Sequence, residues 1–490
     1  MSKNNVPFRP IAMLVAIMVT LLIWFVIPVP TGVKDNAWHL FALFVGTIVA
    51  IIGKALPIGA ISILAITLVA LTGVTADTPK EAMNDALSSF SSSLIWLIAI
   101  AIIISRGLVK TGLGARIAYN VIGIFGKRTL GIGYSLAIAE LLIAPITPSN
   151  TARGGAIIHP IMCSIADSFG SKAHDGTSDK MAKYLALVNY QSNPITSAMF
   201  ITATAPNPLV VELIAKATGN EIHLSWTTWA LAMLLPGLVC ILLMPLVIYW
   251  LAKPTITSTP DVKEFTDKEL AKLGKISRDE KIMLAVFGGM LLLWANVPAM
   301  IFGSAFAVDA TAVAFLGLSV IILTGVLTWD EILTQKSAWD TLIWFGVLIM
   351  MATYLNKLGL VTWFSQGMES MIAGMGISWV YAVAILTAVY LYTHYFFAST
   401  TAHITAMLAA FYGVGIALGA PPMLYALILA AASSLMMTLT HYATGTAPVV
   451  FGSGYVSLGE WWKVGFIMSV VNLVVWIGVG LVWWKLLGFY

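Results

Sequence analysis

Charged residues are scarce in this chain, and cysteine is nearly absent. Only 10% of its 490 residues are Asp, Glu, Lys or Arg, whereas a soluble globular protein has about 25%. This charge content, beside a hydrophobic content of 59%, excludes a soluble globular domain. Cys163 and Cys240 are the two cysteines and both lie within apolar stretches, which excludes a disulfide framework and a multi-cysteine metal site. The net charge of +4 is too small and too scattered for a nucleic-acid partner.

Apolar sequence is abundant, in runs of about 18 to 25 residues, the length that an α-helix needs to cross a roughly 30 Å hydrocarbon layer. The alternating segments of a membrane β-barrel do not occur. The first run, Ile11 to Pro28, lacks a small-residue cleavage site, so we expect a first span rather than a removable signal peptide. We predict an all-α polytopic membrane protein with about 11 transmembrane helices. The predicted spans are 10–29, 36–53, 56–74, 90–108, 183–213, 227–252, 281–299, 305–327, 340–356, 422–450 and 462–488.

Two further apolar stretches, residues 129–168 and 379–416, are interrupted in the middle by Pro or by small polar residues. A single straight helix fits neither stretch, so we predict a re-entrant helical hairpin for each. Pro and small polar residues also interrupt the spans at 183–213 and 422–450, which we expect to be broken helices. Irregular backbone at membrane depth is tolerated only where protein or a water-filled cavity satisfies it, so these interruptions indicate a site.

Basic residues give an independent test of the topology, because short cytoplasmic loops collect Lys and Arg. With the amino terminus inside, most of the 26 basic residues fall in inner segments. We therefore predict a multi-pass protein of the cell membrane with a cytoplasmic amino terminus and an extracytoplasmic carboxy terminus. The charged segment between Lys253 and Lys281 is expected to be a solvated linker on the cytoplasmic side.

The two halves of the chain resemble each other. Leu94-Ile95-Trp96 recurs as Leu342-Ile343-Trp344, an offset of 342 − 94 = 248, and Pro148 to Arg153 aligns with Ala398 to His403, an offset of 399 − 149 = 250. Because the two hairpins would enter from opposite sides, the repeats are inverted, as in many secondary transporters with a site at the midplane. The predicted segments are amino-terminal spans (1–88), a first repeat (89–252), a linker (253–280), two further spans (281–339) and a second repeat (340–490).

The hairpin tips carry residue types that bind carboxylates. Where a hairpin turns, the second limb begins with unpaired backbone N–H groups and a positive dipole end, and Ser, Thr or Asn side chains add donors. Two opposed tips would each hold one end of a short dicarboxylate. The predicted substrate-binding residues are Ser149, Asn150, Thr151, Arg153, Ser399, Thr400, Thr401 and His403. The broken helices offer further candidates for lining the same cavity, namely Ser192, Asn193, Thr204, Thr444 and Thr446.

The Ser149-Asn150-Thr151 motif, its counterpart Ser399-Thr400-Thr401 and the stretch from Thr446 to Tyr455 resemble the divalent anion/sodium symporter (DASS) family of di- and tricarboxylate transporters. Within that family the resemblance is to the citrate/succinate and dicarboxylate exchanger branch. It implies a homodimer in which a fixed scaffold domain carries a moving transport domain that contains the hairpins, an elevator mechanism. Sodium-coupled members carry Ser-Asn-Thr in both repeats, so Thr400 departs from their pattern and removes one amide oxygen.

Each tip also has a potentially cationic residue two positions after its final Thr, Arg153 in one repeat and His403 in the other. A bare charge at the centre of a spanning helix costs about 2.5 to 3.5 kcal/mol, so Arg153 requires a partner. One explanation is that Arg153 and a protonated His403 replace sodium and balance a substrate dianion. The other is that Arg153 pairs with Glu140 and holds the tip together, while His403 is a hydrogen-bonded packing residue.

The predicted function is sodium-independent exchange of one di- or tricarboxylate for another, of the succinate, malate, 2-oxoglutarate and citrate class. A built-in positive charge that cannot dissociate favours obligatory exchange, and a sodium-coupled dicarboxylate symporter is the alternative. An enzyme is not expected, because no acid is placed to orient His403. A channel would need a continuous pore rather than closed tips. We expect no cofactor and no metal, and the expected partners are the carboxylates, membrane lipid and a second copy of the chain.

Overall fold

The computed structural model describes residues 8–372 and 378–490. Over these residues the regular structure is helical, apart from one isolated bridge between Arg128 and Ser258. Eight of the described helices are long and apolar enough to cross a membrane, and several shorter helices are also apolar. The prediction of an all-α polytopic membrane protein is therefore confirmed.

The two repeats follow the same order of helices. The segment before them forms α1 (Pro10–Leu21), α2 (Asp35–Ile52), α3 (Ile58–Thr72) and α4 (Pro79–Leu87). The first repeat forms α5 (Ser93–Thr111), α6 (Leu113–Phe125), α7 (Thr129–Ile143), α8 (His159–Ser168), α9 (Ala182–Met199), α10 (Pro206–Ala217) and α11 (Trp226–Leu251). The second forms α17 (Lys336–Lys357), α18 (Leu360–Ile372), α19 (Trp379–Tyr392), α20 (Thr400–Ala417), α21 (Pro422–Leu435), α22 (Thr446–Gly452) and α23 (Leu458–Leu486). The connecting helices are α12 (Val262–Leu273), α13 (Arg278–Trp294), α14 (Val297–Phe302), α15 (Ala310–Leu323) and α16 (Trp329–Leu333).

Both stretches predicted to be re-entrant hairpins are helix pairs with a break between their limbs. In the first, α7 ends in a 3-10 turn at Ala144–Ile146, and a π-helical segment, Thr151–Ile158, leads into α8. Pro145 lies in that turn, because its ring and missing N–H do not permit the α-helix to continue. In the second hairpin a 3-10 turn at Thr393–Phe396 separates α19 from α20.

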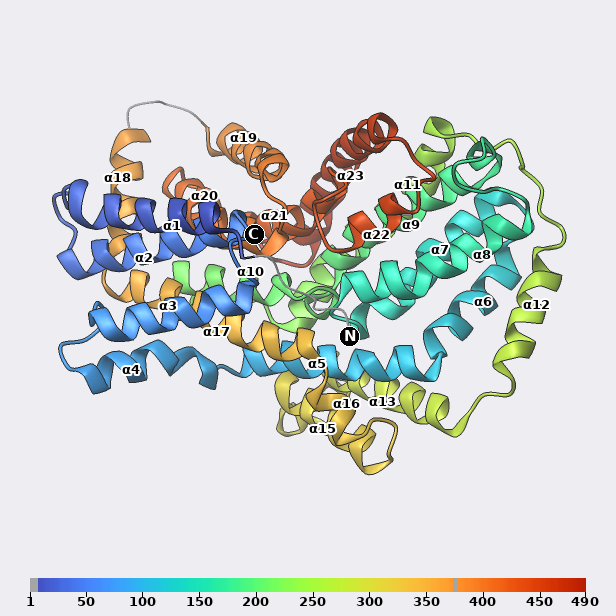
Figure 1. Ribbon diagram of the computed structural model, residues 1–490, viewed down its shortest axis with the longest axis horizontal. Helices are drawn as coiled ribbons and strands as arrows, with labels where there is room; N and C mark the ends of the chain where they lie inside the picture. Colours follow the sequence, from blue (N-terminus) through green and yellow to red (C-terminus); the bar gives the residue numbers. More distant parts are fainter. Residues whose placement is uncertain (1–7, 373–377) are drawn as a thin grey trace.

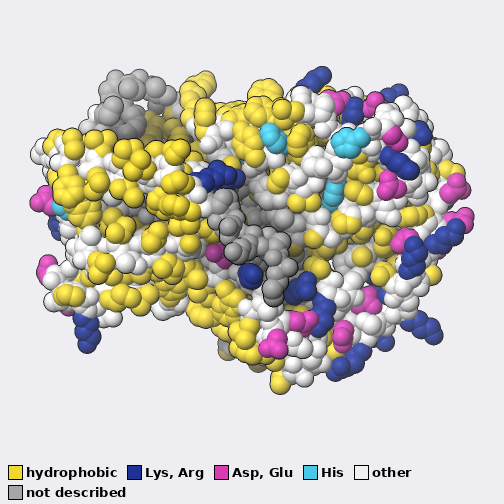
Figure 2. Space-filling view, viewed as in Figure 1, with side chains coloured by type: hydrophobic (Ala, Val, Ile, Leu, Met, Phe, Trp, Pro, Cys, Tyr) yellow, Lys and Arg dark blue, Asp and Glu magenta, His cyan; other side chains and the backbone are white. Residues whose placement is uncertain are grey.

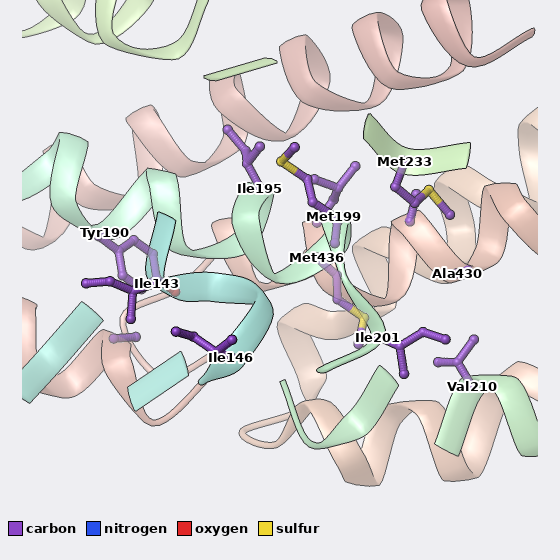
Figure 3. Close-up of a cluster of buried hydrophobic side chains, with 14 of the residues drawn as sticks. Ile143, Ile146, Tyr190, Ile195, Met199, Ile201, Val210, Met233, Ala430 and Met436 are labelled. Atoms are coloured by element: carbon purple, nitrogen blue, oxygen red, sulfur yellow. The ribbon is translucent and has the colours of Figure 1, made fainter. Parts of the chain in front are cut away.

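The two broken helices pack against each other through polar and apolar contacts. Asn207, at the start of α10, donates from Nδ2 to the carbonyl oxygens of Ser197 at 2.7 Å and Phe200 at 2.9 Å. Its Oδ1 accepts a hydrogen bond from Ser434 of α21 at 3.0 Å, so one side chain joins both breaks. Figure 3 shows the apolar residues of this region, to which both broken helices contribute.

Helices α5 and α17 are neighbours that run in opposite directions across the middle of the molecule (Figure 1). Helix α17 also packs against α2 and α3, and α5 packs against α13 and α15. Gly346 of α17 permits the close approach of the 3-10 turn Ser88–Ser91 that precedes α5, because a Cβ atom there would meet the ring of Phe90 at 2.9 Å. Because the two helices are antiparallel, their first turns lie at opposite ends of the pair.

Charged side chains gather at one end of the molecule, over α6, α8 and α12, whereas the surface over α1 to α3 is broadly apolar (Figure 2). We call the end formed by α6, α8 and α12 the charged end and the end formed by α4 and α18 the opposite end. Here the linker is bound to the first hairpin, since the Thr259 N–H donates to the Lys127 carbonyl at 3.0 Å and the Thr129 N–H donates to the Thr257 carbonyl at 3.2 Å. Gly274, with φ 71°, follows α12 and begins the connection to α13.

Candidate binding site between the hairpin tips

A cavity of about 250 Å³ lies between the two hairpin tips. Hydroxyl groups, one amide side chain and small apolar groups form its wall, and none of the described residues that line it is acidic or basic. The lining residues are Ile102, Pro148, Ser149, Asn150, Thr204, Ala205, Pro206, Ser337, Thr341, Ala398, Ser399, Thr400, Thr401, Thr444 and Gly445. Both hairpin tips, both helix breaks and the helices α5 and α17 therefore line the cavity.

The two tips share the same serine cap. Ser149 Oγ accepts the Ala152 N–H at 3.1 Å, and Ser399 Oγ accepts the Ala402 N–H at 3.3 Å. Each serine thus caps the second limb of its hairpin, where the first backbone N–H groups of a helix have no partner within the helix. The partial positive charge of these helix starts favours an anion in the cavity.

Each tip is held on the break of the second broken helix. Asn150 Nδ2 donates to Thr444 Oγ1 at 2.8 Å, and Thr400 Oγ1 donates to the Ala443 carbonyl at 3.2 Å. Gly445 permits close approach of the first tip, because a Cβ atom there would collide with Thr151 Oγ1. The structure therefore brings Asn150, Thr400 and Thr444 to one place, in agreement with the candidates named from the sequence.

Arg153 does not line the cavity. Its guanidinium is fully buried, and Nε donates to Glu140 Oε1 at 2.6 Å in an ion pair. The other four N–H groups are directed to the Thr147 and Ala203 carbonyl oxygens at 2.7 Å each, and to Ser197 Oγ at 3.0 Å and Thr196 Oγ1 at 3.4 Å. All five guanidinium donors have protein partners. This geometry agrees with the explanation in which Arg153 pairs with Glu140 and holds the tip, and it leaves no donor directed at a substrate.

His403 is also buried behind its tip rather than in the cavity wall. Its Nδ1 lies 3.1 Å from Nδ1 of His394, and its Nε2 lies 3.2 Å from Thr393 Oγ1. His394 Nε2 lies 3.1 Å from the Ala443 carbonyl, which can only accept, so we assign the His394 proton to Nε2. Thr393 Oγ1 donates its hydrogen to the Tyr390 carbonyl at 2.8 Å, so His403 Nε2 donates to Thr393, and the contact between the two Nδ1 atoms would need a further proton on one of the rings.

The aromatic surroundings of His403 support a packing role. Its ring stacks on Tyr390 and on Phe397, with centroids 4.7 Å apart in both pairs. Among the described residues no Asp or Glu forms a salt bridge with either ring. A protonated ring would therefore be a buried cation without a countercharge among the described residues, and the polar contacts of His403 are with Thr393 and His394, as the hydrogen-bonded packing explanation requires.

The remaining candidates form a layer behind the cavity. Asn193 Nδ2 donates to Glu140 Oε1 at 2.6 Å and to the Asn150 carbonyl at 3.1 Å, while its Oδ1 accepts from Thr446 at 3.2 Å. Ser192 Oγ is bonded to its own helix, at the Asn189 carbonyl. Of the five candidates from the broken helices, only Thr204 and Thr444 line the cavity. Asn193 and Thr446 support the first tip from behind, whereas Ser192 is bonded only within α9.

Sequence reasoning missed four residues near the site. Ile102, Ser337 and Thr341 line the cavity from α5 and α17, and His394 supports the second tip. The repeat alignment contains a signal for Thr341, which directly precedes the second Leu-Ile-Trp marker as Ser93 precedes the first. No motif distinguishes His394, whose role depends on the turn that brings it next to His403.

Two capped hairpin tips that face one cavity between paired broken helices are the arrangement of a secondary membrane transporter. Residues 9–490 match the family model described as the sodium:sulfate symporter transmembrane region. The chain thus belongs to the DASS family of membrane transporters, and it is not an enzyme.

Several curated relatives match nearly the whole chain. A putative malate transporter, YflS, of Bacillus subtilis is 48% identical over 98% of this chain and 97% of its own length. The chloroplastic dicarboxylate transporter 1 of Arabidopsis thaliana is 45% identical over 98% of this chain and 83% of its own length. An L-tartrate/succinate antiporter of Shigella sonnei is 34% identical over 93% of this chain and 94% of its own length.

A solved structure shares the fold at low sequence identity. The YdaH transporter of Alcanivorax borkumensis is 12% identical and aligns with a TM-score of 0.54 over 88% of this chain and 97% of its own. This likeness extends the evidence for a polytopic transporter fold.

Proposed function

We propose that this protein exchanges one small dicarboxylate for another across the membrane without sodium. The observation that carries the proposal is the cavity between two capped hairpin tips, which offers hydroxyl, amide and backbone donors from opposite sides and no acidic side chain. A carboxylate at each end of a short acid would accept from one tip.

The substrate class is that of succinate, malate, 2-oxoglutarate and, in the tricarboxylate series, citrate. The proteins named as malate, dicarboxylate and tartrate/succinate transporters support this choice because they match almost the whole chain. A cavity of about 250 Å³ suits a small acid. The substrate contacts we propose are Ser149, Asn150, Ser399, Thr400 and Thr401 at the tips, with Thr204 and Thr444 from the breaks.

Independence from sodium follows from the protein donors that are hydrogen-bonded to the backbone carbonyl oxygens near the tips, because these bonds use the oxygens that sodium would need as ligands. The resemblance to sodium-coupled members implies that tips and broken helices there supply oxygen ligands to sodium. Here the Ala443 carbonyl accepts from both His394 and Thr400, which uses both of its lone pairs. In the first repeat Arg153 donates to the Ala203 carbonyl. Arg153 and His394 therefore act as hydrogen-bond donors on these carbonyls, and His403 orients His394.

Obligatory exchange follows from the cost of moving an empty site. Without substrate, the helix starts and hydroxyl donors at the tips have no anion to satisfy them in a region of low polarity. The Arg153–Glu140 pair sums to zero, so it supplies no free charge to the cavity. A bound dicarboxylate satisfies the donors, and the loaded form crosses at lower cost than the empty form.

We further propose an elevator mechanism in a homodimer, with α1 to α5, α13, α15 and α17 as the fixed scaffold and with the hairpins and broken helices as the moving transport domain. The charged end would face the cytoplasm. The mass of the protein in nanodiscs would show whether it is a dimer. Cleavage of the linker by protease added to sealed vesicles would show which side of the membrane the charged end faces.

The function is tested in proteoliposomes. Vesicles loaded with unlabelled succinate should take up labelled succinate in sodium-free buffer, and empty vesicles should not. Uptake into empty vesicles that rises with an inward sodium gradient would instead establish a sodium-coupled symporter. A panel of unlabelled acids on the trans side would then rank the substrates.

A further inference from the structure

The cavity has one wall that the hairpins and broken helices do not supply. Ser337 and Thr341 lie in the first two turns of α17, and Ile102 lies in the middle of α5. Both helices belong to the proposed scaffold, which stays fixed while the tips move. A residue of the scaffold that contacts the substrate would do so in only one position of the transport domain.

Both hydroxyls of α17 are arranged to donate into the cavity. Thr341 is 7% exposed and lines the cavity, and its hydroxyl has no hydrogen-bond partner among the described residues. Ser337 Oγ accepts the Gln335 amide at 3.1 Å, which leaves its own hydroxyl hydrogen for another acceptor. The Thr341 hydroxyl is open to the cavity, so a ligand oxygen there can accept its hydrogen bond.

The inverted repeat supplies a second pair of hydroxyls on the other scaffold helix. With the offset of 248 set by the Leu-Ile-Trp markers, Thr341 corresponds to Ser93 and Ser337 corresponds to Ser89. Ser89 lies just before α5, and Ser93 is its first residue. Because α5 and α17 run in opposite directions, these serines lie nearer the opposite end, whereas Ser337 and Thr341 lie nearer the charged end.

In each pair one residue is buried and the other is exposed. Thr341 and Ser89 are buried, whereas Ser337 and Ser93 are exposed. Ile102 shares the cavity with Thr341 and lies nine residues beyond Ser93 on α5, so the two stations are separated by roughly 14 Å along the helix at about 1.5 Å per residue. One pair therefore lines the cavity, while the corresponding pair lies outside it, further along the same scaffold.

We propose that the scaffold itself contacts the dicarboxylate at two alternate stations, Ser337 with Thr341 at the charged end and Ser89 with Ser93 at the opposite end. This inference rests on the proposed exchange by a moving transport domain. Each hydroxyl pair donates to a carboxylate oxygen that faces the scaffold, in addition to the contacts made by the tips. The substrate affinity at each membrane face is consequently set in part by a different pair of hydroxyls.

The test measures the succinate concentration that gives half-maximal exchange at each membrane face separately, in intact cells and in inverted membrane vesicles. The exchanged acid on the other side is kept at a saturating concentration. Ser337→Ala with Thr341→Val should raise the value about 3- to 10-fold at the charged end only, as expected for one or two lost hydrogen bonds. Ser89→Ala with Ser93→Ala should raise it by a similar factor at the opposite end only. Thr341→Ser should retain the wild-type value.

Thr67→Val is the matched control, because Thr67 is an exposed scaffold threonine bonded to its own helix at the Ile63 carbonyl. It should change neither value. The face that a variant leaves unchanged reports that the variant is folded. Equal changes at both faces, or no change at either, would overturn the inference while leaving exchange intact. Absence of exchange in the wild-type protein would instead refute the proposed function.

Discussion

The two hairpin tips share a backbone plan but differ in what supports them from behind. At both tips a serine caps the second limb with nearly the same bond, 3.1 Å at Ser149 and 3.3 Å at Ser399. Behind the first tip lies an ion pair, and behind the second lie two stacked histidines. The capped limb is common to both repeats, while the support differs, so we attribute anion binding to the caps rather than to the supporting residues.

The supports occupy matching positions in the two repeats. With an offset of 250, Arg153 corresponds to His403 and Glu140 corresponds to Tyr390 (390 − 140 = 250). Glu140 pairs with Arg153, and Tyr390 stacks on His403. Thus the same two positions are in contact in each repeat, once through charge and once through aromatic stacking, and in both repeats a basic side chain donates to a carbonyl in the broken helix.

The largest effect is expected from removing one partner of the ion pair. Arg153→Met leaves Glu140 as a buried charge and should lower the free energy of unfolding by about 3 to 5 kcal/mol, with loss of exchange. Adding Glu140→Gln should recover much of the stability and measurable exchange. Thermal unfolding in detergent and counterflow give the two readouts. A stable, folded Arg153→Met protein with weakened substrate binding would mean that Arg153 contacts the substrate.

The repeats should also differ in tolerance at the position after the supporting residue. Gly154 corresponds to Ile404 (404 − 154 = 250), but a Cβ atom at Gly154 would meet Asn193 Nδ2 at 2.8 Å and Thr446 Cγ2 at 3.0 Å. Gly154→Ala should cost about 1 to 3 kcal/mol of stability through overpacking. Ile404→Val should cost about 0.5 to 1.5 kcal/mol as an ordinary truncation. If Gly154→Ala lowered the free energy of unfolding no more than a neutral surface substitution, the first tip would not need this close approach.

Removing the histidine support should have a smaller effect on stability than removing one partner of the ion pair, because it leaves no buried charge without a partner. His403→Phe keeps the stacking but leaves His394 Nδ1 without its hydrogen-bond partner, which should cost about 1 to 3 kcal/mol. Because no carboxylate among the described residues forms a salt bridge with these buried rings to stabilise a cation, exchange of a fully ionised substrate should stay nearly constant between roughly pH 6 and 8. Exchange that rises toward low pH in the wild type, and not in His403→Gln, would establish a protonated His403.

The smallest effect, and an equal one at both tips, is expected from the caps. Ser149→Ala and Ser399→Ala should each lower the free energy of unfolding by about 1 kcal/mol. The two variants should weaken succinate binding by the same factor as each other. Isothermal titration of each purified variant measures the affinity. A strong effect at one tip and none at the other would show that the substrate is held by a single tip.

Apolar run length and internal repetition were sufficient to predict the helical membrane fold, the two hairpins and the breaks in the helices that follow them. The same offset located the tip residues Ser149, Asn150, Ser399 and Thr400, which line one cavity. These features are local in sequence, since Pro and small polar residues interrupt an apolar run wherever they occur.

The partners of buried polar groups were harder to predict. A guanidinium at membrane depth requires compensation, but the sequence left open whether a substrate or Glu140 provides it. The decision depends on where Thr147, Ser197 and Ala203 lie in space, and these residues come from separate elements. Likewise the side chain of His394 is brought to His403 by a 3-10 turn that has no sequence signature of its own.

The attachment of the linker to the first hairpin limits the stroke of any elevator in this molecule. Because the backbone bonds at Thr129 and Thr259 hold the start of the linker on the hairpin and α12 packs against α6 and α8, residues 274–277 are the segment left to extend before α13 begins. Four residues reach at most about 14 Å when fully extended. This reach is about equal to the roughly 14 Å that separates Ser93 from Ile102 along α5, so shortening residues 274–277 should stop the proposed elevator movement before it is complete.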